Sequence, residues 1–313
     1  MEKICPRCGA RFECRHDSIE SCHCTSVRLS DEQRDYIARN YSGCLCHHCL
    51  ENITTEPHPV SVRELANFLL DLSRTLMGAG AHTSRVVRNV TRIAESFGYK
   101  VDMTIFQMHI TMTIRHAGDD TIRRTSVGKI GPAAFNFDII SQISSLSWEA
   151  HDEHLSFREL TEKYERIIRK PRISRWWVLV LVTAANACFC RLFGGDVPAM
   201  GLVAAATFVG FFVRLEMSTR HANHMAIFLI CSFIASLIAS AGFRFHLGTT
   251  PETALGTSVL FLIPGVPLIN SIFDLLEGHV LVGISRAVNA LILIVCIALG
   301  LSATLLILGL DTL

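Results

Sequence analysis

The segment from Trp176 to Leu310 constrains this chain most, because it is overwhelmingly apolar and separates into four or five stretches long enough to cross a bilayer. A membrane-spanning helix needs about 20 apolar residues to cover roughly 30 Å of hydrocarbon. The sequence therefore predicts an α-helical polytopic membrane domain of about five helices over residues 171–313, lying in a lipid bilayer. We place the spans near residues 176–193, 198–215, 223–243, 255–277 and 280–309.

The part of the chain that precedes the spans is polar and rich in cysteine. Eight of the twelve cysteines fall within the first 50 residues, whereas the other four lie inside apolar runs, where a free thiol behaves as a small hydrophobe. The net charge of +1 and the hydrophobic fraction of 50% average these unlike halves and describe neither. No apolar segment typical of a signal peptide precedes the first cysteines, so we expect the amino-terminal end to stay in the cytosol.

Residues 1–50 predict a small zinc-binding module. So short a stretch buries little apolar core, and in a reducing compartment metal–thiolate bonds are favoured over disulfides as staples. The knuckle CPRCG lets two sulfurs and backbone N–H groups converge on one tetrahedral ion. Eight thiolates match two structural Zn²⁺ sites of four cysteines each. The candidate ligands are Cys5, Cys8, Cys14, Cys22, Cys24, Cys44, Cys46 and Cys49.

Alternatives to this arrangement stay open at the level of sequence. One site with spare cysteines, an oxidised segment or a simply thiol-rich segment would give the same composition. The histidines that could replace individual ligands are His16, His23, His47 and His48. The pattern C-x2-C…C…C-x-C…GCLCHHCL resembles the small cysteine-rich CWC family, although the Cys-Trp-Cys triplet of that family reads Cys22-His23-Cys24 here. The resemblance implies a structural module and no reaction.

Residues 51–60 are polar, contain two prolines and predict a linker. Beyond it, residues 61–170 predict a cytosolic α+β domain. A capping box of Ser61 and Glu64 opens the first helix, and a second box of Ser156 and Glu159 opens the last. The β-rich runs around the turn HAGDD predict a hairpin. We expect helices over residues 61–80, 84–98, 135–150 and 156–170, with the hairpin within 99–127.

The charges that flank the spans predict the orientation of the chain. A basic run abuts Trp176-Trp177, and positive charge beside interfacial tryptophan marks the cytoplasmic entrance of a first span. The loop between the second and third spans carries Arg214 and Arg220. With five spans, we expect a multi-pass protein of the cell (inner) membrane whose amino-terminal domains are cytoplasmic and whose carboxyl end is outside. We do not expect nucleic acid as a partner. The basic run consists of Arg166, Arg169, Lys170, Arg172 and Arg175.

The fourth span contains the segment FLIPGVPLINSIFDLLEG, which predicts a broken helix. Pro264 and Pro267 each remove a backbone donor, and Gly265 loosens the chain between them. Transporters bind substrates or coupling ions at such breaks. Asn270 and Asp274 are four residues apart and share a helix face, so both become candidate substrate-site residues. A proline kink used only for helix packing is the alternative.

The fifth span adds Arg286 and Asn289, which are three residues apart on one helix face. Arg286 could pair with Asp274 or Glu277 across the turn between the two spans. At the level of sequence, a salt bridge that fixes this hairpin and a role in binding substrate stay equally open.

Several segments together resemble the threonine/serine exporter family over roughly residues 62–313. They are Gly80-Ala81-His82-Thr83-Ser84-Arg85-Val86, then Arg92-Ile93-Ala94 and Gly98, then Pro264-Gly265-x4-Asn270, and finally Gly283-Ile284-Ser285-Arg286. The family pattern has Glu where this chain has Val87.

This resemblance implies export of small amino acids or dicarboxylates, driven by the proton-motive force, with a cytosolic domain ahead of the spans. Thr83 and Arg85 are the residues of its cytosolic-domain motif. Full-length members carry a second hydrophobic half, and split members supply it as a separate polypeptide. Because this chain ends at Leu313, it resembles the first subunit of the split form.

Five spans are few for a transporter, whose site usually forms between two related repeats or bundles. We therefore expect a second small multi-span membrane subunit, a homo-oligomer, or both. A membrane-anchored, zinc-dependent sensor or regulator is the alternative function. No nucleophile–base pair, phosphate-binding Gly-rich loop or paired carboxylates stand at useful spacing, so we expect no enzyme. The sequence does not separate an amino acid from a dicarboxylate as the substrate.

Overall fold

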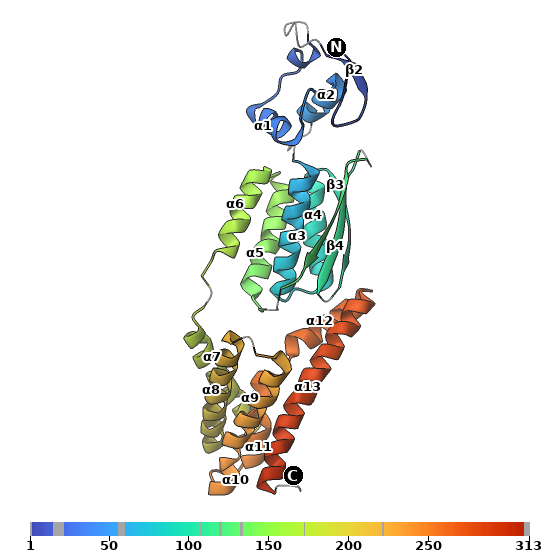
Figure 1. Cartoon of the computed structure of the whole chain (residues 1–313). Helices are drawn as coiled ribbons and strands as arrows, with labels where there is room; N and C mark the ends of the chain where they lie inside the picture. The colour runs from blue at the N-terminus through green and yellow to red at the C-terminus, as the bar shows by residue number, and fades with distance from the viewer. Residues whose placement is uncertain are drawn as a thin grey trace. The chain divides into compact units, whose positions relative to one another are not determined.

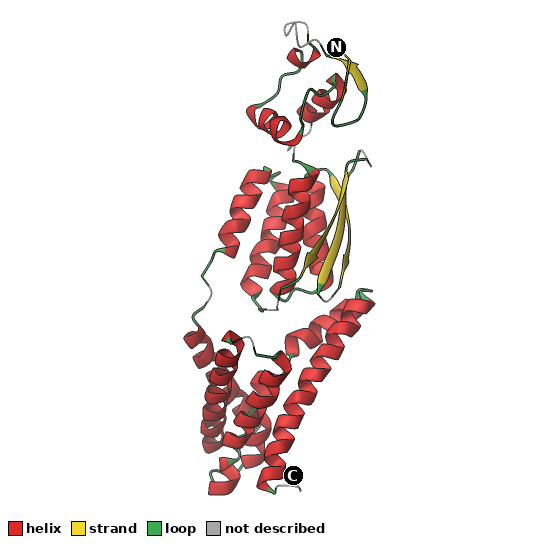
Figure 2. Cartoon of the chain, in the orientation of Figure 1, coloured by secondary structure: helices red, strands yellow, loops and turns green. Residues whose placement is uncertain are grey.

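The computed structural model describes residues 2–14, 22–55, 60–106, 108–118, 121–131, 134–171, 173–220 and 222–309. The chain divides into two units, Met1–Arg169 and Lys170–Leu313, and Figures 1 and 2 show strands in the first unit and helices in both. Parts of the sequence prediction fall outside the described residues, among them His16, the middle of the linker at 56–59, residues 119–120 of the turn HAGDD, Arg172 in the basic run, and the chain end from Leu310.

The cysteine-rich segment begins with a small hairpin. Strand β1 (Glu2–Ile4) pairs antiparallel with β2 (Arg11–Glu13). A 3₁₀ turn, η2 (His23–Thr25), and helices α1 (Asp31–Asn40) and α2 (His47–Thr55) follow. Helix α2 continues through the first residues of the predicted linker. Leu45, Leu50 and Ile53 form most of the apolar core here, so the packed interior is small.

The next segment consists of a three-stranded antiparallel sheet and four helices. The predicted hairpin around HAGDD is confirmed as the pairing of β4 with β5, and β3 extends it to the order β3-β4-β5. Helix α3 packs on β4 and β5, and α4 packs on β3. The elements are α3 (Val62–Gly78), α4 (Thr83–Ser96), β3 (Tyr99–Ile105), β4 (His109–His116), β5 (Arg123–Lys129), α5 (Phe137–Asp152) and α6 (Phe157–Ile168).

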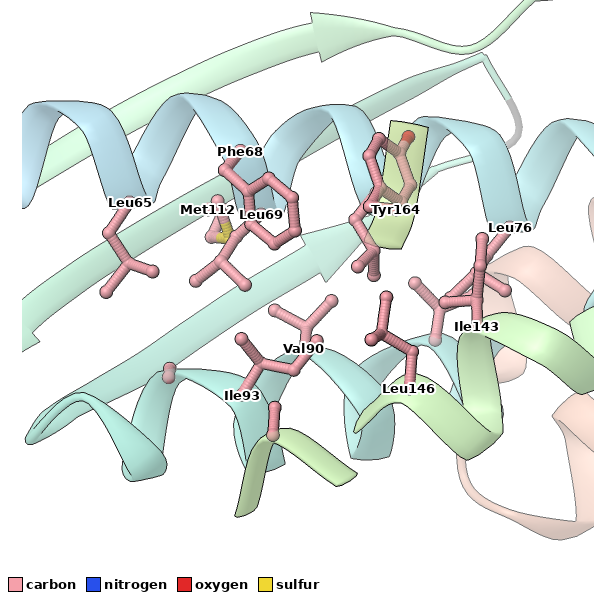
Figure 3. Close-up of a cluster of buried hydrophobic side chains, with 14 of the residues drawn as sticks. Leu65, Phe68, Leu69, Leu76, Val90, Ile93, Met112, Ile143, Leu146 and Tyr164 are labelled. Atoms are coloured by element: carbon pink, nitrogen blue, oxygen red, sulfur yellow. The ribbon is translucent and has the colours of Figure 1, made fainter. Parts of the chain in front are cut away.

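Helix α3 supplies the centre of this core. Leu65, Leu69 and Leu76 recur at helical spacing and are fully buried. Figure 3 shows Leu69 facing Val90 and Ile93 of α4, Leu76 beside Ile143 of α5, and Met112 of β4 and Tyr164 of α6 close to the same stripe. Full burial of one such leucine contributes about 1.5–3 kcal/mol, so the α3 stripe is a large share of what holds these elements together.

Both predicted helix starts are found, with different caps. At α6, Ser156 and Glu159 form the complete capping box. At α3, the Ser61 hydroxyl accepts from the Glu64 N–H at 3.1 Å and donates to the Glu64 carboxylate at 2.8 Å. The first half of the box is therefore present at Ser61, and the glutamate side chain binds the hydroxyl.

The second unit consists of apolar helices. Among the described residues, four helical segments are long and apolar enough to cross a membrane, namely Arg175–Leu192, Val197–Thr219, His224–Phe245 and Val280–Leu308. A fifth crossing is possible as the bent pair Pro251–Leu262 and Gly265–Leu276. The elements are α7 (Arg175–Leu192), α8 (Val197–Thr219), α9 (His224–Ala239), α10 (Ala241–Phe245), α11 (Pro251–Thr257), η3 (Leu260–Leu262), α12 (Gly265–Leu276) and α13 (Val280–Leu308).

Hydroxyl and amide side chains join these helices where they cross. Ser232 of α9 donates to the Ile297 carbonyl of α13 at 2.7 Å. Asn186 of α7 donates to the Thr207 hydroxyl of α8 at 2.6 Å and to the Thr257 carbonyl at 3.2 Å. Such bonds are worth about 0.6 kcal/mol each on average between membrane helices, so their main effect is to fix helix register.

Candidate functional site

The predicted break in the fourth span is confirmed at Pro264. The axis bends by 62° between the helical stretch that ends at Leu262 and α12. Pro264 is the N-cap of α12, with φ −78° and ψ 58°. Pro267 lies in the first turn of α12, where a missing backbone donor has no intrahelical acceptor to lose. One proline therefore breaks the span and the other is accommodated.

A buried ion pair joins α12 to α13. Nη1 of Arg286 lies 2.9 Å from Oδ2 of Asp274, whose side chain is fully buried, while the Arg286 side chain is 13% exposed. Sequence analysis left Glu277 as the other candidate partner, and the structure places Arg286 against Asp274.

The two helices approach closely because of Gly283. A Cβ at this position would lie 2.7 Å from Cγ of Leu275 and 2.9 Å from the Ser271 carbonyl oxygen. Any larger residue would push α12 away from α13 and lengthen the ion pair. The Gly283-x2-Arg286 segment therefore supplies both the close approach and the charge.

The remaining predicted membrane residues surround this pair at different levels of exposure. Pro264 is buried, and Gly265 and Asn270 are partly buried. Asn289 donates to the Ser285 carbonyl one turn earlier in α13, at 3.3 Å. The structure thus brings Asp274 and Arg286 into contact and leaves Asn270 and Asn289 on the same helical hairpin.

The predicted motif that contains Thr83 and Arg85 begins at a turn that only glycine fits. Gly80 has φ +92°, and a Cβ there would lie 2.3 Å from Cδ1 of Phe135. Thr83 starts α4 and is 1% exposed, whereas Arg85 in the same turn is exposed. Of the two predicted motif residues, Thr83 is therefore part of the packed interior and Arg85 faces outward.

Arg92, also quoted in the family pattern, has a structural environment that the sequence did not reveal. Nη1 donates to the Ser147 hydroxyl at 2.7 Å and to Oδ1 of Asn89 at 3.3 Å. The guanidinium carbon lies 3.5 Å from the Trp148 ring centroid. These contacts connect α4 to α5, and Ser147 is 55 residues from Arg92 along the chain.

Four cysteines form a cluster whose geometry suits a metal ion. The sulfurs of Cys5, Cys8, Cys46 and Cys49 all lie within 4.8 Å of one another, and those of Cys8 and Cys46 are 3.6 Å apart. Tetrahedral Zn²⁺ with Zn–S bonds of about 2.3 Å requires sulfur separations of about 3.8 Å. Two C-x2-C segments supply the ligands, one from the β1–β2 hairpin and one from the first turn of α2.

The cluster favours a thiolate at one position. Burial raises the pKa of the Cys5 thiol, but backbone N–H groups of Cys46, Cys8 and Arg7 donate to the sulfur and bring its pKa down to about 6. The Cys46 N–H lies 3.4 Å from that sulfur. A metal-binding site needs deprotonated sulfur, so the backbone already favours the ligand form.

The other four cysteines form pairs within the described residues. The sulfurs of Cys14 and Cys44 are 3.6 Å apart. The Cys24 thiol donates a hydrogen bond to the Cys22 sulfur, and this bond, followed by burial, raises the pKa of Cys24 to about 11. In this part of the chain, the structure contains one group of four sulfurs with metal-binding geometry, rather than the two that the composition suggested.

The described histidines of the module have other partners. The His23 ring contacts the Leu45 carbonyl at 2.8 Å, and the His47 ring lies 3.3 Å from the Glu51 carboxylate. His48 lies 3.4 Å from the Asn52 side chain. Among the described residues, the group with metal-binding geometry therefore consists of the four cysteines and includes no histidine.

The prediction that Arg214 is a charge of the loop between the second and third spans was wrong. Helix α8 continues to Thr219, so Arg214 lies inside it, with a partly buried side chain. The signal was present in the sequence, because the segment FFVRLEM continues the apolar run of the second span past the arginine. Its partners could not be read locally, since the carbonyl that it contacts belongs to Phe261.

Comparison with known families gives two matches. Residues 67–308 match the ThrE family, described as "Putative threonine/serine exporter". Residues 5–51 match the cysteine-rich CWC family. Both resemblances noted from the sequence are confirmed by these matches. No solved structure matches the chain.

Individual relatives agree with the larger match. The chain is 26% identical over 248 residues to a "Probable succinate transporter subunit YjjP" of Klebsiella aerogenes, covering 78% of this chain and 94% of that protein. It is 26% identical over 252 residues to the Escherichia coli K12 protein of the same name, covering 79% and 96%. It is 22% identical to a "Probable threonine/serine exporter" of Mycobacterium tuberculosis, covering 78% of this chain and 46% of that protein.

Proposed function

Since the chain belongs to the threonine/serine exporter family, we propose that it is one subunit of a secondary-active exporter of small polar metabolites. The substrates are threonine/serine-type amino acids or dicarboxylates, and transport is coupled to protons. The observation that carries this proposal is the ion pair of Asp274 and Arg286 beside a broken span. Ionisable residues within membrane segments are costly and mark substrate or proton pathways.

The groups near the break have complementary chemistry. The break at Pro264 interrupts the backbone ladder of the span, and transporters bind substrates or coupling ions at such breaks. Asn270 offers a neutral donor and acceptor, and Asp274 can take up and release a proton. Arg286 can counter that carboxylate or bind a substrate carboxylate through its planar fork.

The coverage of the relatives supports the second subunit that we propose. The aligned region accounts for 94% and 96% of two proteins named as transporter subunits, and for 46% of a protein named as an exporter. This difference supports a split arrangement, in which another multi-span chain, with or without further copies of this one, completes the pathway.

The placement of the chain belongs to the same proposal. We place it in the inner membrane with the cysteine-rich module and the α+β domain in the cytoplasm, because basic residues precede the first span and two tryptophans begin it. The four-sulfur cluster of Cys5, Cys8, Cys46 and Cys49 holds a structural Zn²⁺. A zinc-dependent sensor is the second candidate function, and this cluster is the observation in its favour.

Efflux measurements test the transport proposal. Cells that express this chain with its second subunit are preloaded with labelled succinate or threonine, and efflux is scaled to the amount of chain in the membrane. Asn270→Ala and Asp274→Asn should each reduce efflux strongly. Glu252→Gln is the matched control, because it makes the same carboxylate-to-amide change at an exposed residue of α11 on the same bent span. Wild-type efflux by both site variants at normal membrane levels would show that the break serves only helix packing.

A further inference from the structure

Arg214 is a membrane-embedded cation that takes no part in the ion pair of Asp274 and Arg286. It lies five residues before the end of α8, which is about 7 Å along the helix at 1.5 Å per residue. None of the carboxylates in the described residues lies within 4.0 Å of its guanidinium. The nearest acidic residue along the helix, Glu216, pairs with Arg220 at 2.8 Å. Arg214 therefore keeps a net positive charge inside the membrane unit.

Two buried rings and one carbonyl surround this guanidinium. Its central carbon lies 5.6 Å from the ring centroid of Phe211 and 5.2 Å from that of Phe228. Nη1 reaches the Phe261 carbonyl at 3.5 Å, the outer limit of a hydrogen bond. A guanidinium has five N–H donors in its plane. Aromatic rings attract the cation through their π-faces and take up none of these donors as a carboxylate would.

The contact with Phe261 places the guanidinium at the break in the fourth span. Phe261 belongs to η3, three residues before Pro264. Helix α12 begins at Gly265 without a side-chain cap, so the positive end of its dipole also lies at this break. Both features favour an anion at the same place.

The guanidinium of Arg286 already has the Asp274 carboxylate 2.9 Å away, so a substrate carboxylate must compete for Arg286 but not for Arg214. We propose that Arg214 binds a carboxylate of the transported molecule at the broken fourth span. This inference rests on the proposed transport function and deepens it, since threonine and succinate share the carboxylate. The planar fork of arginine matches two carboxylate oxygens, which a lysine ammonium does not.

Ligand stabilisation of the purified full-length chain tests the inference without requiring transport. Thermal denaturation in detergent is followed with succinate and threonine, and with their neutral amides succinamide and threoninamide. Wild-type chain should be stabilised by at least one carboxylate and not by its amide. Arg214→Gln should weaken that binding at least tenfold, Arg214→Lys should weaken it less, and Arg220→Gln, an exposed arginine on the same helix, should leave it unchanged.

Three results would overturn the inference. In the first, Arg214→Gln binds the carboxylate as the wild type does. In the second, the wild type shows no preference for carboxylate over amide. In the third, phosphatidylglycerol added to the micelles stabilises the wild type in an Arg214-dependent way while both carboxylates fail, which would identify a lipid phosphate as the occupant. Efflux by the wild type, measured in parallel, shows separately whether the transport function stands.

Discussion

Removing one charge of the Asp274–Arg286 pair should destabilise the chain far more than removing both. At 2.9 Å the Coulomb attraction is about 6 kcal/mol at an effective dielectric constant of about 20, before the cost of desolvation. Loss of one partner leaves the other charge buried and uncompensated, which costs about 3–5 kcal/mol. Because Asp274 is fully buried and Arg286 is 13% exposed, water can reach only the arginine once the pair is broken.

The assay is a double-mutant cycle. Asp274→Asn, Arg286→Gln and the combined variant are purified in detergent, and thermal denaturation is followed for each. A change of 1 kcal/mol shifts the melting temperature by about 2–4 °C in chains of 150–250 residues, so a loss of about 3–5 kcal/mol should lower the melting temperature of each single variant by about 6–20 °C. The combined variant carries no unpaired charge and should recover most of that loss.

Export by the combined variant then separates structure from transport. If Asp274 carries the proton, the combined variant should be abundant and stable yet inactive in efflux. Single variants that melt within 1 °C of the wild type would refute the energetic reasoning. A combined variant that exports at the wild-type rate would refute the proton-carrying role of Asp274 and leave the pair as a hairpin clasp.

Three further predictions concern other parts of the chain. Elemental analysis of the chain purified under reducing conditions should give at least one zinc per chain. The zinc should be lost in Cys46→Ser and kept in Cys188→Ser, whose thiol is exposed on α7. Less than one equivalent of zinc in the folded wild type would contradict the prediction. Gly80→Ala should cost about 1–3 kcal/mol because of its positive φ and the nearby Phe135 ring, while Gly131→Ala, with open space around its Cβ, should be neutral in the same thermal melt. A reporter active only in the cytosol and fused after Leu313 should stay silent, and a signal would mean an even number of spans.

The local features of the fold could be predicted because each is written in a short stretch of sequence. Helix starts at Ser61 and Ser156 follow from capping chemistry, and the break at Pro264 follows from the missing backbone donor. Strand β3 lies within the predicted β-rich stretch, but the sequence did not separate it from the hairpin of β4 and β5, because strand pairing depends on partners beyond the adjacent turn.

Contacts between distant segments could not be predicted in the same way. Helical spacing predicts which helix faces carry Asp274 and Arg286. Whether Arg286 pairs with Asp274 or with Glu277, however, depends on how the two helices of the hairpin are rotated about their close approach at Gly283. The grouping of cysteines had the same difficulty, because each C-x2-C segment is local, whereas the pairing of Cys8 with Cys46 spans 38 residues.

The helical hairpin of α12 and α13 gives a physical reason for expecting a second chain. Ile272, Leu276 and Leu281 are exposed, as residues facing lipid or an apolar partner should be. Asn270 and Arg286, however, are only partly buried in this chain. Polar groups left at the surface of a membrane segment are costly unless they line a cavity or meet another helix. A bundle that presents both kinds of residue on one hairpin is therefore best completed by a neighbour that covers the polar side, which is what a transporter built from two membrane subunits provides.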